Sequence, residues 1–180
     1  MDDLIKVNEE VFYSRASIQA MGPEAVDFIK KQAAENPRRR CRICLHPHPD
    51  HPFHDMLIVH AGNTYVRPHL HNQKVESTHV VEGKAIVVIF DGKGLPQNAF
   101  AVGGADTGFP FLFRIEPGTV HMLLIQSEWL VFHESTTGPF DPAMTRFPNW
   151  APDESNPSAV RIFMARIEGL AGAYLAPRKK

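Results

Sequence analysis

The sequence predicts a mainly β protein: an antiparallel sandwich or barrel with one helix near each end. Between residues 40 and 135, short runs of strand-forming residues alternate with turns rich in Gly, Pro, Asn and Asp. Strands at such close spacing favour antiparallel pairing, because parallel strands need longer crossover connections. A chain of 180 residues can bury one hydrophobic core without a metal or a disulfide. We therefore expect a single domain.

Residues 1–36 are predicted to form an N-terminal extension made of a short strand, at 11–13, and a helix. The helix is expected to begin at Pro23, because proline suits the first helical turn and an acidic residue follows it. The pair Asn36-Pro37 is expected to end it. Apolar residues repeat on one face of this helix, so we expect it to pack on the main body.

Residues 37–137 are predicted to form the β-barrel, and residues 138–180 a strap and a helix packed on it. The strap is proline-rich, and the helix is expected to be capped by Asn156 and to end at Gly169. The barrel strands are expected at 40–45, 56–60, 64–71, 77–81, 85–90, 99–102, 111–115, 121–125 and 129–135.

Composition argues against several classes of partner. Lys and Arg number 19 and Asp and Glu 20, so a net charge of −1 provides no long-range attraction to nucleic acid or to an anionic membrane. The longest apolar run, residues 85–90, is far shorter than a membrane span. No leader pattern opens the chain, and two cysteines make no disulfide framework. We expect a cytoplasmic protein without nucleic-acid or membrane partners.

Ten histidines against two cysteines raise the question of a metal site. Residues two apart on a strand share a face, so His69 and His71 are expected to point the same way. Glu76 can return to them from the next strand, and His121, after the turn Pro117-Gly118, can supply a third imidazole. Imidazoles and a carboxylate suit a divalent ion, and four such ligands leave coordination positions open.

These residues carry a resemblance. The pattern His-x-His, four residues, Glu, six residues, Gly, and a later Pro-Gly-x-x-His resembles the two metal-binding motifs of the cupin superfamily. Further segments resemble the WbuC-type cupin fold metalloproteins over roughly residues 37–155. They are Arg-Arg-Arg at 38–40, Cys-Leu-His-Pro at 44–47, His-Asp-Met-Leu-Ile at 54–58, Thr-Gly-Pro-Phe-Asp-Pro at 137–142 and Trp-Ala-Pro-Asp-Glu at 150–154.

The resemblance implies a single cupin (jelly-roll) β-barrel with an N-terminal and a C-terminal helix. It also implies that His69, His71, Glu76 and His121 bind one metal ion inside the barrel. Departures from the cupin pattern concern the spacing before His69, the turn before His121, and Ile125, which stands where many cupins have Asn. The metal is not specified, since Fe, Mn, Ni, Zn and Co all accept these ligands.

Three further residues are candidates for catalytic roles. Tyr65 and Arg67 share strand parity with His69 and His71, so both are expected to line the cavity. Arg67 suits a substrate carboxylate or phosphate, or alternatively pairs with a carboxylate at the rim. His133 fits either a proton-transfer role or a core or interface histidine.

Other histidines and the cysteines are expected to lie outside the chemistry. His79 has the opposite parity to Glu76 and is expected to face away from the metal. Residues 46–54, with four histidines among prolines, fit a solvated loop with one or two structural histidines, or alternatively a second metal site. Cys41 and Cys44 are three apart, hence on opposite faces of a strand, so a thiol function is not expected.

Three functions stay open. The first is a metal-dependent enzyme on a small polar molecule; the WbuC resemblance implies a sugar or sugar nucleotide in bacterial surface-polysaccharide (O-antigen) biosynthesis, with isomerase-like chemistry. The second is an Fe(II)-dependent dioxygenase, and the third a non-catalytic module that binds a metal or small ligand. Fold alone does not choose among them. A homodimer is a further expectation, since cupins commonly pair through their sheets.

Overall fold

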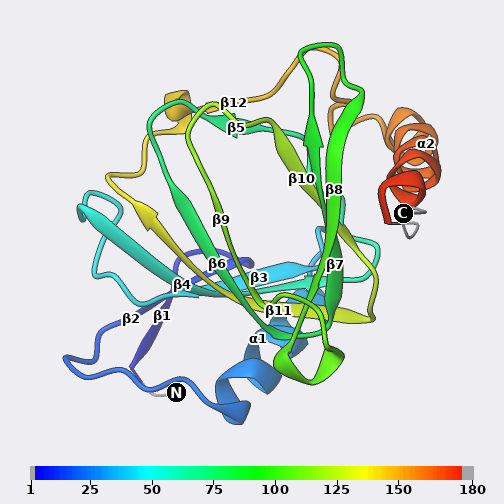
Figure 1. The fold of residues 1–180 in the computed structure, drawn as a ribbon. Helices are drawn as coiled ribbons and strands as arrows, with labels where there is room; N and C mark the ends of the chain where they lie inside the picture. Colours follow the sequence, from blue (N-terminus) through cyan, green and yellow to red (C-terminus); the bar gives the residue numbers. More distant parts are fainter. Residues whose placement is uncertain (1–2, 176–180) are drawn as a thin grey trace.

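The computed structural model describes residues 3–175 and is mainly β, with helix α1 (Pro23–Glu35) near the N-terminus and helix α2 (Pro157–Leu175) at the other end (Figure 1). Two short 3-10 turns, η1 (Ala105–Thr107) and η2 (Pro142–Met144), lie between strands. The strands are β1 (Leu4–Lys6), β2 (Val11–Ser14), β3 (Arg40–Cys44), β4 (Phe53–Ala61), β5 (Leu70–His71), β6 (Glu76–Glu82), β7 (Lys84–Phe90), β8 (Pro96–Gly103), β9 (Leu112–Ile115), β10 (His121–Ile125), β11 (Trp129–Thr137) and β12 (Thr145–Arg146).

The strands form two facing layers. One is the sheet β1-β2-β3-β4-β11-β6-β9, and the other is β10-β7-β8. The short pair β5–β12 extends the second layer, because His69, directly before β5, forms a β-bridge with His121 at the start of β10. From β4 onward, the order β4-β11-β6-β9 faces β5-β10-β7-β8, which is the interleaved order of a jelly roll. The predicted fold class is confirmed, although the layers do not close into one continuous sheet among the described residues.

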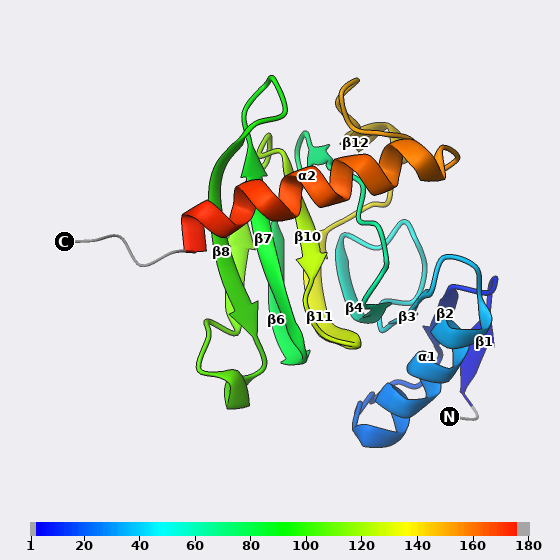
Figure 2. The same cartoon turned by 90° about the vertical axis from the view of Figure 1, so that its right-hand side faces the viewer.

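The predicted N-terminal extension continues the large layer. Strand β2 pairs in parallel with β3, and β1 pairs antiparallel with β2. Helix α1 covers the outer face of β3, β4 and β11, where Ile29 and Ala33 are completely buried (Figure 2). Burial of an apolar face, more than intrinsic helix propensity, holds such a helix in place.

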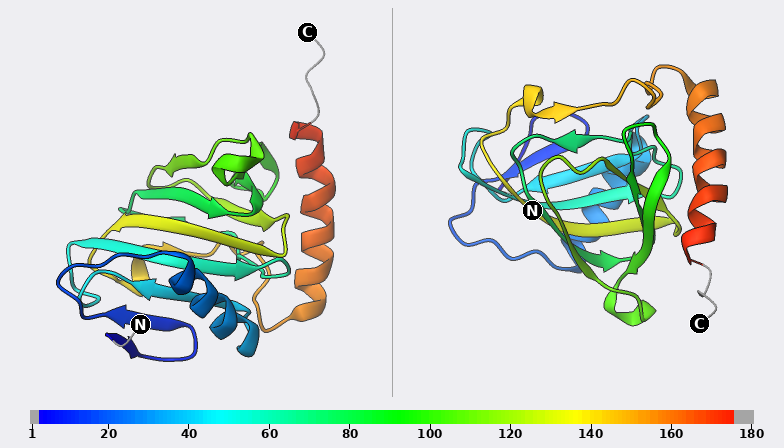
Figure 3. Two further views of the ribbon diagram at one scale, coloured as in Figure 1. Left: turned by 90° about the horizontal axis from the view of Figure 1, so that it is seen from below. Right: turned by 45° about the horizontal axis from the view of Figure 1, so that its top comes forward.

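Helix α2 lies across the outer face of β7, β8 and β10 (Figures 2 and 3). Asn156 caps it as predicted, since its side-chain oxygen accepts a hydrogen bond from the amide of Ala159 at 3.1 Å. The predicted end at Gly169 is wrong, because the helix continues to Leu175. Glycine costs about 1 kcal/mol in a helix, and the complete burial of Ala171 in the next turn offsets that cost.

Other differences from the predicted elements have local causes. Of the expected strand at 64–71 only residues 69–71 are paired, His69 in the bridge to His121 and Leu70–His71 as β5, and β1 and β12 are additional. His54, predicted to lie in a loop, belongs to β4, where it pairs with Thr136 of β11. Among residues 3–175, no helix is long and apolar enough to cross a membrane.

The space between the two layers is apolar over most of its length. Its core contains buried side chains from both sheets, among them Val80, Val87, Leu130 and Phe132. The polar exception is the region beneath β5, β12 and the start of β10, where inward-facing side chains are histidine and glutamate. The candidate site lies there.

Candidate metal centre

Four side chains from three strand regions converge beneath β5. His69 and His71 flank Leu70, Glu76 opens β6 and His121 opens β10. The two carboxylate oxygens of Glu76 contact different imidazoles: Oε1 lies 2.9 Å from Nε2 of His71, and Oε2 lies 3.2 Å from Nε2 of His121. The ring of His69 lies beside both others, with centroids 4.5 Å from His121 and 5.0 Å from His71.

The outward nitrogens of the three imidazoles are each held by a hydrogen-bond partner. Nδ1 of His69 lies 2.8 Å from the carbonyl oxygen of Arg67, and Nδ1 of His121 lies 3.0 Å from that of Thr119. Nδ1 of His71 lies 3.0 Å from the hydroxyl of Thr145. Because a carbonyl only accepts, Nδ1 of His69 and of His121 carries a proton, and in a neutral ring the lone pair is then on the inward Nε2. Metal-binding histidines show this arrangement.

The electrostatics of the site favour an ionised carboxylate at Glu76 and a neutral imidazole at His69. Burial alone would raise the pKa of Glu76, but hydrogen bonds from His121 and His71 outweigh it and hold the pKa of this carboxyl well below its usual range. Burial, and second the neighbouring His121, lower the pKa of His69 to about 4. A metal ion requires these protonation states of its ligands.

The geometry fits a divalent ion. His69, Glu76 and His121 offer ligand atoms that all lie within 4.8 Å of one another. His71 lies beside this group of three, with its Nε2 2.9 Å from Oε1 of Glu76. Two donors at right angles around an ion, each about 2.1 Å from it, lie about 3 Å apart, close to the 2.9 and 3.2 Å separations observed. In the described part of the chain, no other three His, Cys, Asp or Glu side chains come this close.

The predicted catalytic candidates lie away from the cluster. The hydroxyl of Tyr65 donates to the carbonyl of Pro152, and its ring packs on Phe163 of α2. Strand parity does not determine where the side chain of Tyr65 points, because residues 64–69 form no ladder with a neighbouring strand.

Arg67 lies at the rim and is already paired. Its Nη1 donates to Asp153 at 2.5 Å, its Nη2 donates to the carbonyl of Ala151, and its guanidinium lies 4.6 Å over the ring of Phe147. Of the two roles that the sequence left open for Arg67, the structure shows the pairing with a carboxylate.

His133 and His79 lie on the outer face of the large layer. They are directly paired across β11 and β6, and His133 contacts Asp55. The outward orientation predicted for His79 is confirmed. His133 is therefore separated from the cluster by the sheet itself, and a role in proton transfer at the cluster has no geometric support.

Glu134 is an inward-facing carboxyl that the sequence argument missed. It lies on the same side of β11 as the buried Phe132, opposite Thr78 of β6. Burial, and second the negative charge of Glu76, raise the pKa of Glu134 to about 8, against opposing effects of Arg42 and Lys74. The alternation of β11 contained the signal, since Leu130, Phe132 and Glu134 share a face.

Replacing Glu134 by Gln is expected to stabilise the metal-free protein, compared with wild type, more at high pH than at low pH. The folded pKa lies above the unfolded value of 4.5, so wild-type stability falls as the pH rises from about 4.5 to about 8. Between about pH 5 and pH 8, the free energy of unfolding of Glu134→Gln should gain about 3 kcal/mol relative to wild type. Urea unfolding at both values measures this. The exposed Glu128→Gln is the control, and parallel changes in all three proteins would contradict the prediction.

Two histidines of the histidine-rich segment, His46 and His54, have structural contacts. The rings of His46 and His54 are buried and stacked, with centroids 4.0 Å apart. Their nitrogens contact backbone groups, Nδ1 of His46 those of Asp55 and Nε2 of His54 the carbonyl of Pro49. Cys41 and Cys44 are buried in different core clusters, as expected for opposite faces of β3.

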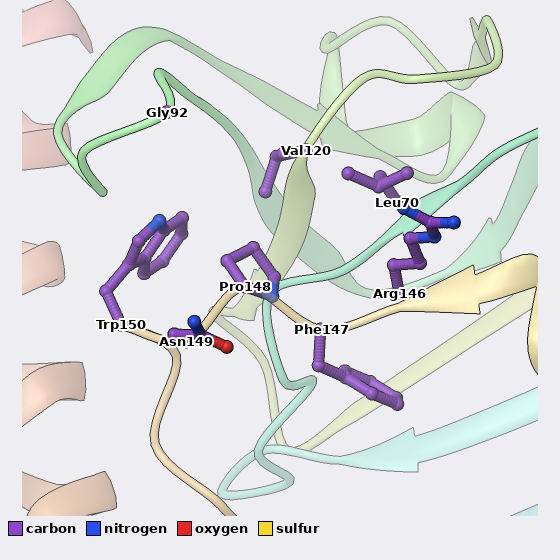
Figure 4. Close-up of a pocket in the computed structure, with 8 residues that line it drawn as sticks. All are labelled: Leu70, Gly92, Val120, Arg146, Phe147, Pro148, Asn149 and Trp150. Atoms are coloured by element: carbon purple, nitrogen blue, oxygen red, sulfur yellow. The ribbon is translucent and has the colours of Figure 1, made fainter.

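Two cavities lie outside the barrel. One, of about 410 Å³, lies where the strap passes beside β5 and the β7–β8 turn (Figure 4). Leu70 and Val120 line it, and both alternate in sequence with the clustered histidines, so this cavity lies behind the cluster. Its other lining residues are Gly92, Arg146, Phe147, Pro148, Asn149 and Trp150. The second, of about 610 Å³, lies between α2 and the start of β3.

Comparisons with known proteins leave the activity open. Residues 22–102 match a family described as a domain of unknown function, DUF6016. No curated protein matches the chain. Similar solved structures include an uncharacterized conserved protein with a double-stranded β-helix domain from Klebsiella pneumoniae, at 13% identity, 60% coverage of this chain, 78% of that chain and a TM-score of 0.46.

Two further similar structures belong to proteins with described roles. The capsular polysaccharide assembling protein CapF from Staphylococcus aureus is 17% identical over 62% of this chain and 32% of its own, with a TM-score of 0.49. A mutant of oxalate decarboxylase OxdC from Bacillus subtilis is 19% identical over 60% of this chain and 27% of its own, with a TM-score of 0.47. This chain thus spans about a third or less of each. The jelly roll is defined by the strand order above, not by these distant likenesses.

Proposed function

We propose that this protein is a divalent-metal-binding cupin protein that acts on a small polar molecule, with His69, His71, Glu76 and His121 as the metal ligands. The observation that carries the proposal is the convergence of Glu76 with three imidazoles whose outward nitrogens are each held by a hydrogen-bond partner. Four ligands leave roughly two of six octahedral positions open. When bound, the ion would supply Lewis-acid polarisation of an oxygen atom.

The chain's own residues would orient the ion and exclude water. Glu76 contributes the negative charge, and the carbonyls of Arg67 and Thr119 hold two imidazoles in place. The apolar core between the layers closes the site from below. Interactions with charge are stronger in such a water-poor setting than at the surface.

The proposed substrate class is a sugar or sugar nucleotide of bacterial surface-polysaccharide biosynthesis. The WbuC-type resemblance of residues 37–155 supports this class. Open positions on the ion would also suit a sugar, because a carbonyl and a neighbouring hydroxyl, or two vicinal hydroxyls, could bind there. Oxygen ligands of this kind suit hard to borderline divalent ions.

Proton NMR of Mn²⁺-loaded protein tests this function. Paramagnetic Mn²⁺ should broaden the lines of sugars that carry a hydroxyl beside a carbonyl or a second hydroxyl, and conversion of one such sugar should follow in time. His69→Ala should abolish the broadening. His79→Ala removes a histidine of the same barrel on the outer face and is the matched control.

Other results of these measurements would indicate a different function. Oxygen uptake by the Fe²⁺-loaded protein would indicate a dioxygenase. Broadening of sugar lines without any conversion would indicate a binding module. Equal spectra for wild type and His69→Ala would contradict the assignment of the site.

A further inference from the structure

The hydrogen-bond partner of His71 differs in kind from those of the other two histidines. His69 and His121 each place Nδ1 against the carbonyl oxygen of the residue two positions earlier, at 2.8 and 3.0 Å. Both contacts are local and belong to the barrel itself. His71 instead places Nδ1 against the hydroxyl of Thr145, 74 residues later in the chain.

The backbone pairing of the barrel explains why His71 departs from the local pattern. The carbonyl two positions before it belongs to His69, and that oxygen accepts the amide of His121 at 2.9 Å in the bridge between the two segments. The barrel has therefore used this acceptor to join β5 to β10. A partner for the outward nitrogen of His71 has to come from another segment.

The strap supplies that partner at a position fixed by backbone contacts. Thr145 lies directly opposite His71 in the β12–β5 ladder, so both side chains are on the same face. The amide of Asn72 donates to the carbonyl of Met144 at 3.0 Å, and the side chain of Asp141 accepts the amide of Ala143 at 2.8 Å. These contacts fix the backbone of the strap directly before Thr145, and the ladder fixes Thr145 itself.

A hydroxyl differs from a carbonyl because it can donate as well as accept. Without metal, Nε2–H of a neutral His71 can donate to Oε1 of Glu76, 2.9 Å away, while Nδ1 accepts from Thr145. With metal, Nδ1–H can donate to Thr145 and free the Nε2 lone pair. One proton leaves Nε2 to solvent and one enters at Nδ1 from solvent, so the ring keeps its charge.

We propose that Thr145 is a positioning residue that lets His71 exchange tautomers between the metal-free and metal-loaded states without losing a hydrogen bond. His69 and His121 keep Nδ1 against carbonyl oxygens, which only accept, whereas the hydroxyl beside Nδ1 of His71 can serve either tautomer. This inference rests on the proposed metal site. It adds that the strap, outside the barrel, completes the site.

Nitrogen-15 NMR of the imidazoles and zinc titration test the proposal together. Spectra are recorded at about pH 8, where ordinary imidazoles are neutral, with and without Zn²⁺. Wild-type His71 should carry its proton on Nε2 without Zn²⁺ and on Nδ1 with it. Thr145→Val keeps the shape but removes the hydroxyl, and should weaken zinc affinity about 10- to 100-fold, as outer contacts of this kind do.

Two matched variants separate the hydrogen bond from packing. Thr145→Ser keeps the hydroxyl and should restore the affinity to within about threefold of wild type. Thr137→Val makes the same change at an exposed position at the end of β11 and should leave the zinc affinity unchanged. Circular dichroism checks that each variant is folded.

The results that overturn the proposal are separate from those that overturn the metal site. Unchanged zinc affinity in Thr145→Val, or a single tautomer of His71 in both states, would remove the role of Thr145. If wild-type protein binds no Zn²⁺, the metal site itself fails. Even then the metal-free spectra test the contact, because Thr145→Val should shift the tautomer balance of His71 alone.

Discussion

Replacing Glu76 by Gln is expected to weaken divalent-metal binding by more than about 100-fold, the upper range for loss of an outer hydrogen-bond partner. The change keeps the size of the side chain but removes its charge, which both His71 and His121 contact. An amide also presents an N–H group on one side, where the carboxylate offers only lone pairs. Isothermal titration of metal-free protein with Zn²⁺ and Mn²⁺ measures the change.

The inward Glu134→Gln is the control for this experiment. Glu134→Gln makes the same chemical change on the same inner face, one strand away from Glu76. The imidazoles of His71 and His121 form ion pairs with Glu76, whereas Glu134 forms no hydrogen bond or ion pair with any of the three imidazoles. Its affinity for either ion should change by less than about tenfold. Equal losses in the two variants would mean that net charge inside the barrel, not ligation by Glu76, governs binding.

Replacing Gly83 by Ala is expected to destabilise the fold by about 3–5 kcal/mol, from left-handed strain and steric overlap together. Gly83 joins β6 to β7 with a φ of +86°, a conformation that side chains other than glycine rarely adopt. A Cβ there would lie 2.0 Å from the carbonyl oxygen of Trp129. That oxygen belongs to the backbone of β11, so it cannot move without disturbing the central strand.

Gly92→Ala is the matched comparison for Gly83→Ala. Gly92 lies in the next turn of the same layer, its φ is not in the left-handed region, and a Cβ there meets nothing within 4 Å. We expect its free energy of unfolding to stay within about 0.5 kcal/mol of wild type, as for most surface changes. Urea unfolding followed by circular dichroism measures both, and similar stabilities would contradict the account of the β6–β7 turn.

Strand alternation made much of the site predictable from the sequence. The parity of His69 and His71 placed both on one face, and the outward orientation of His79 follows from its odd spacing to Glu76. Regular ladders enforce this alternation, because a shift of one residue would turn a whole strand inside out. The strand 121–125 was predicted with its observed bounds from the apolar run that follows the turn Pro117-Gly118.

Alternation failed where the backbone is not paired. Residues 64–71 were predicted to form one strand, and Tyr65 and Arg67 were therefore expected in the cavity, but residues 64–68 are not paired. In the structure these residues contact α2 and the strap, which a local pattern cannot reveal. The contact of Thr145 could not be predicted from a local pattern either, because its partner His71 is 74 residues away. Long-range pairing of this kind depends on the whole fold.

The most direct test of the central claim is the metal content of the purified protein. Elemental analysis of wild type, His121→Ala and His133→Ala compares a histidine inside the barrel with one on the outer face of the next strand. The account predicts about one divalent ion per chain in wild type and His133→Ala, and little in His121→Ala. Full metal content in His121→Ala, or none in all three after purification with divalent ions present, would contradict it.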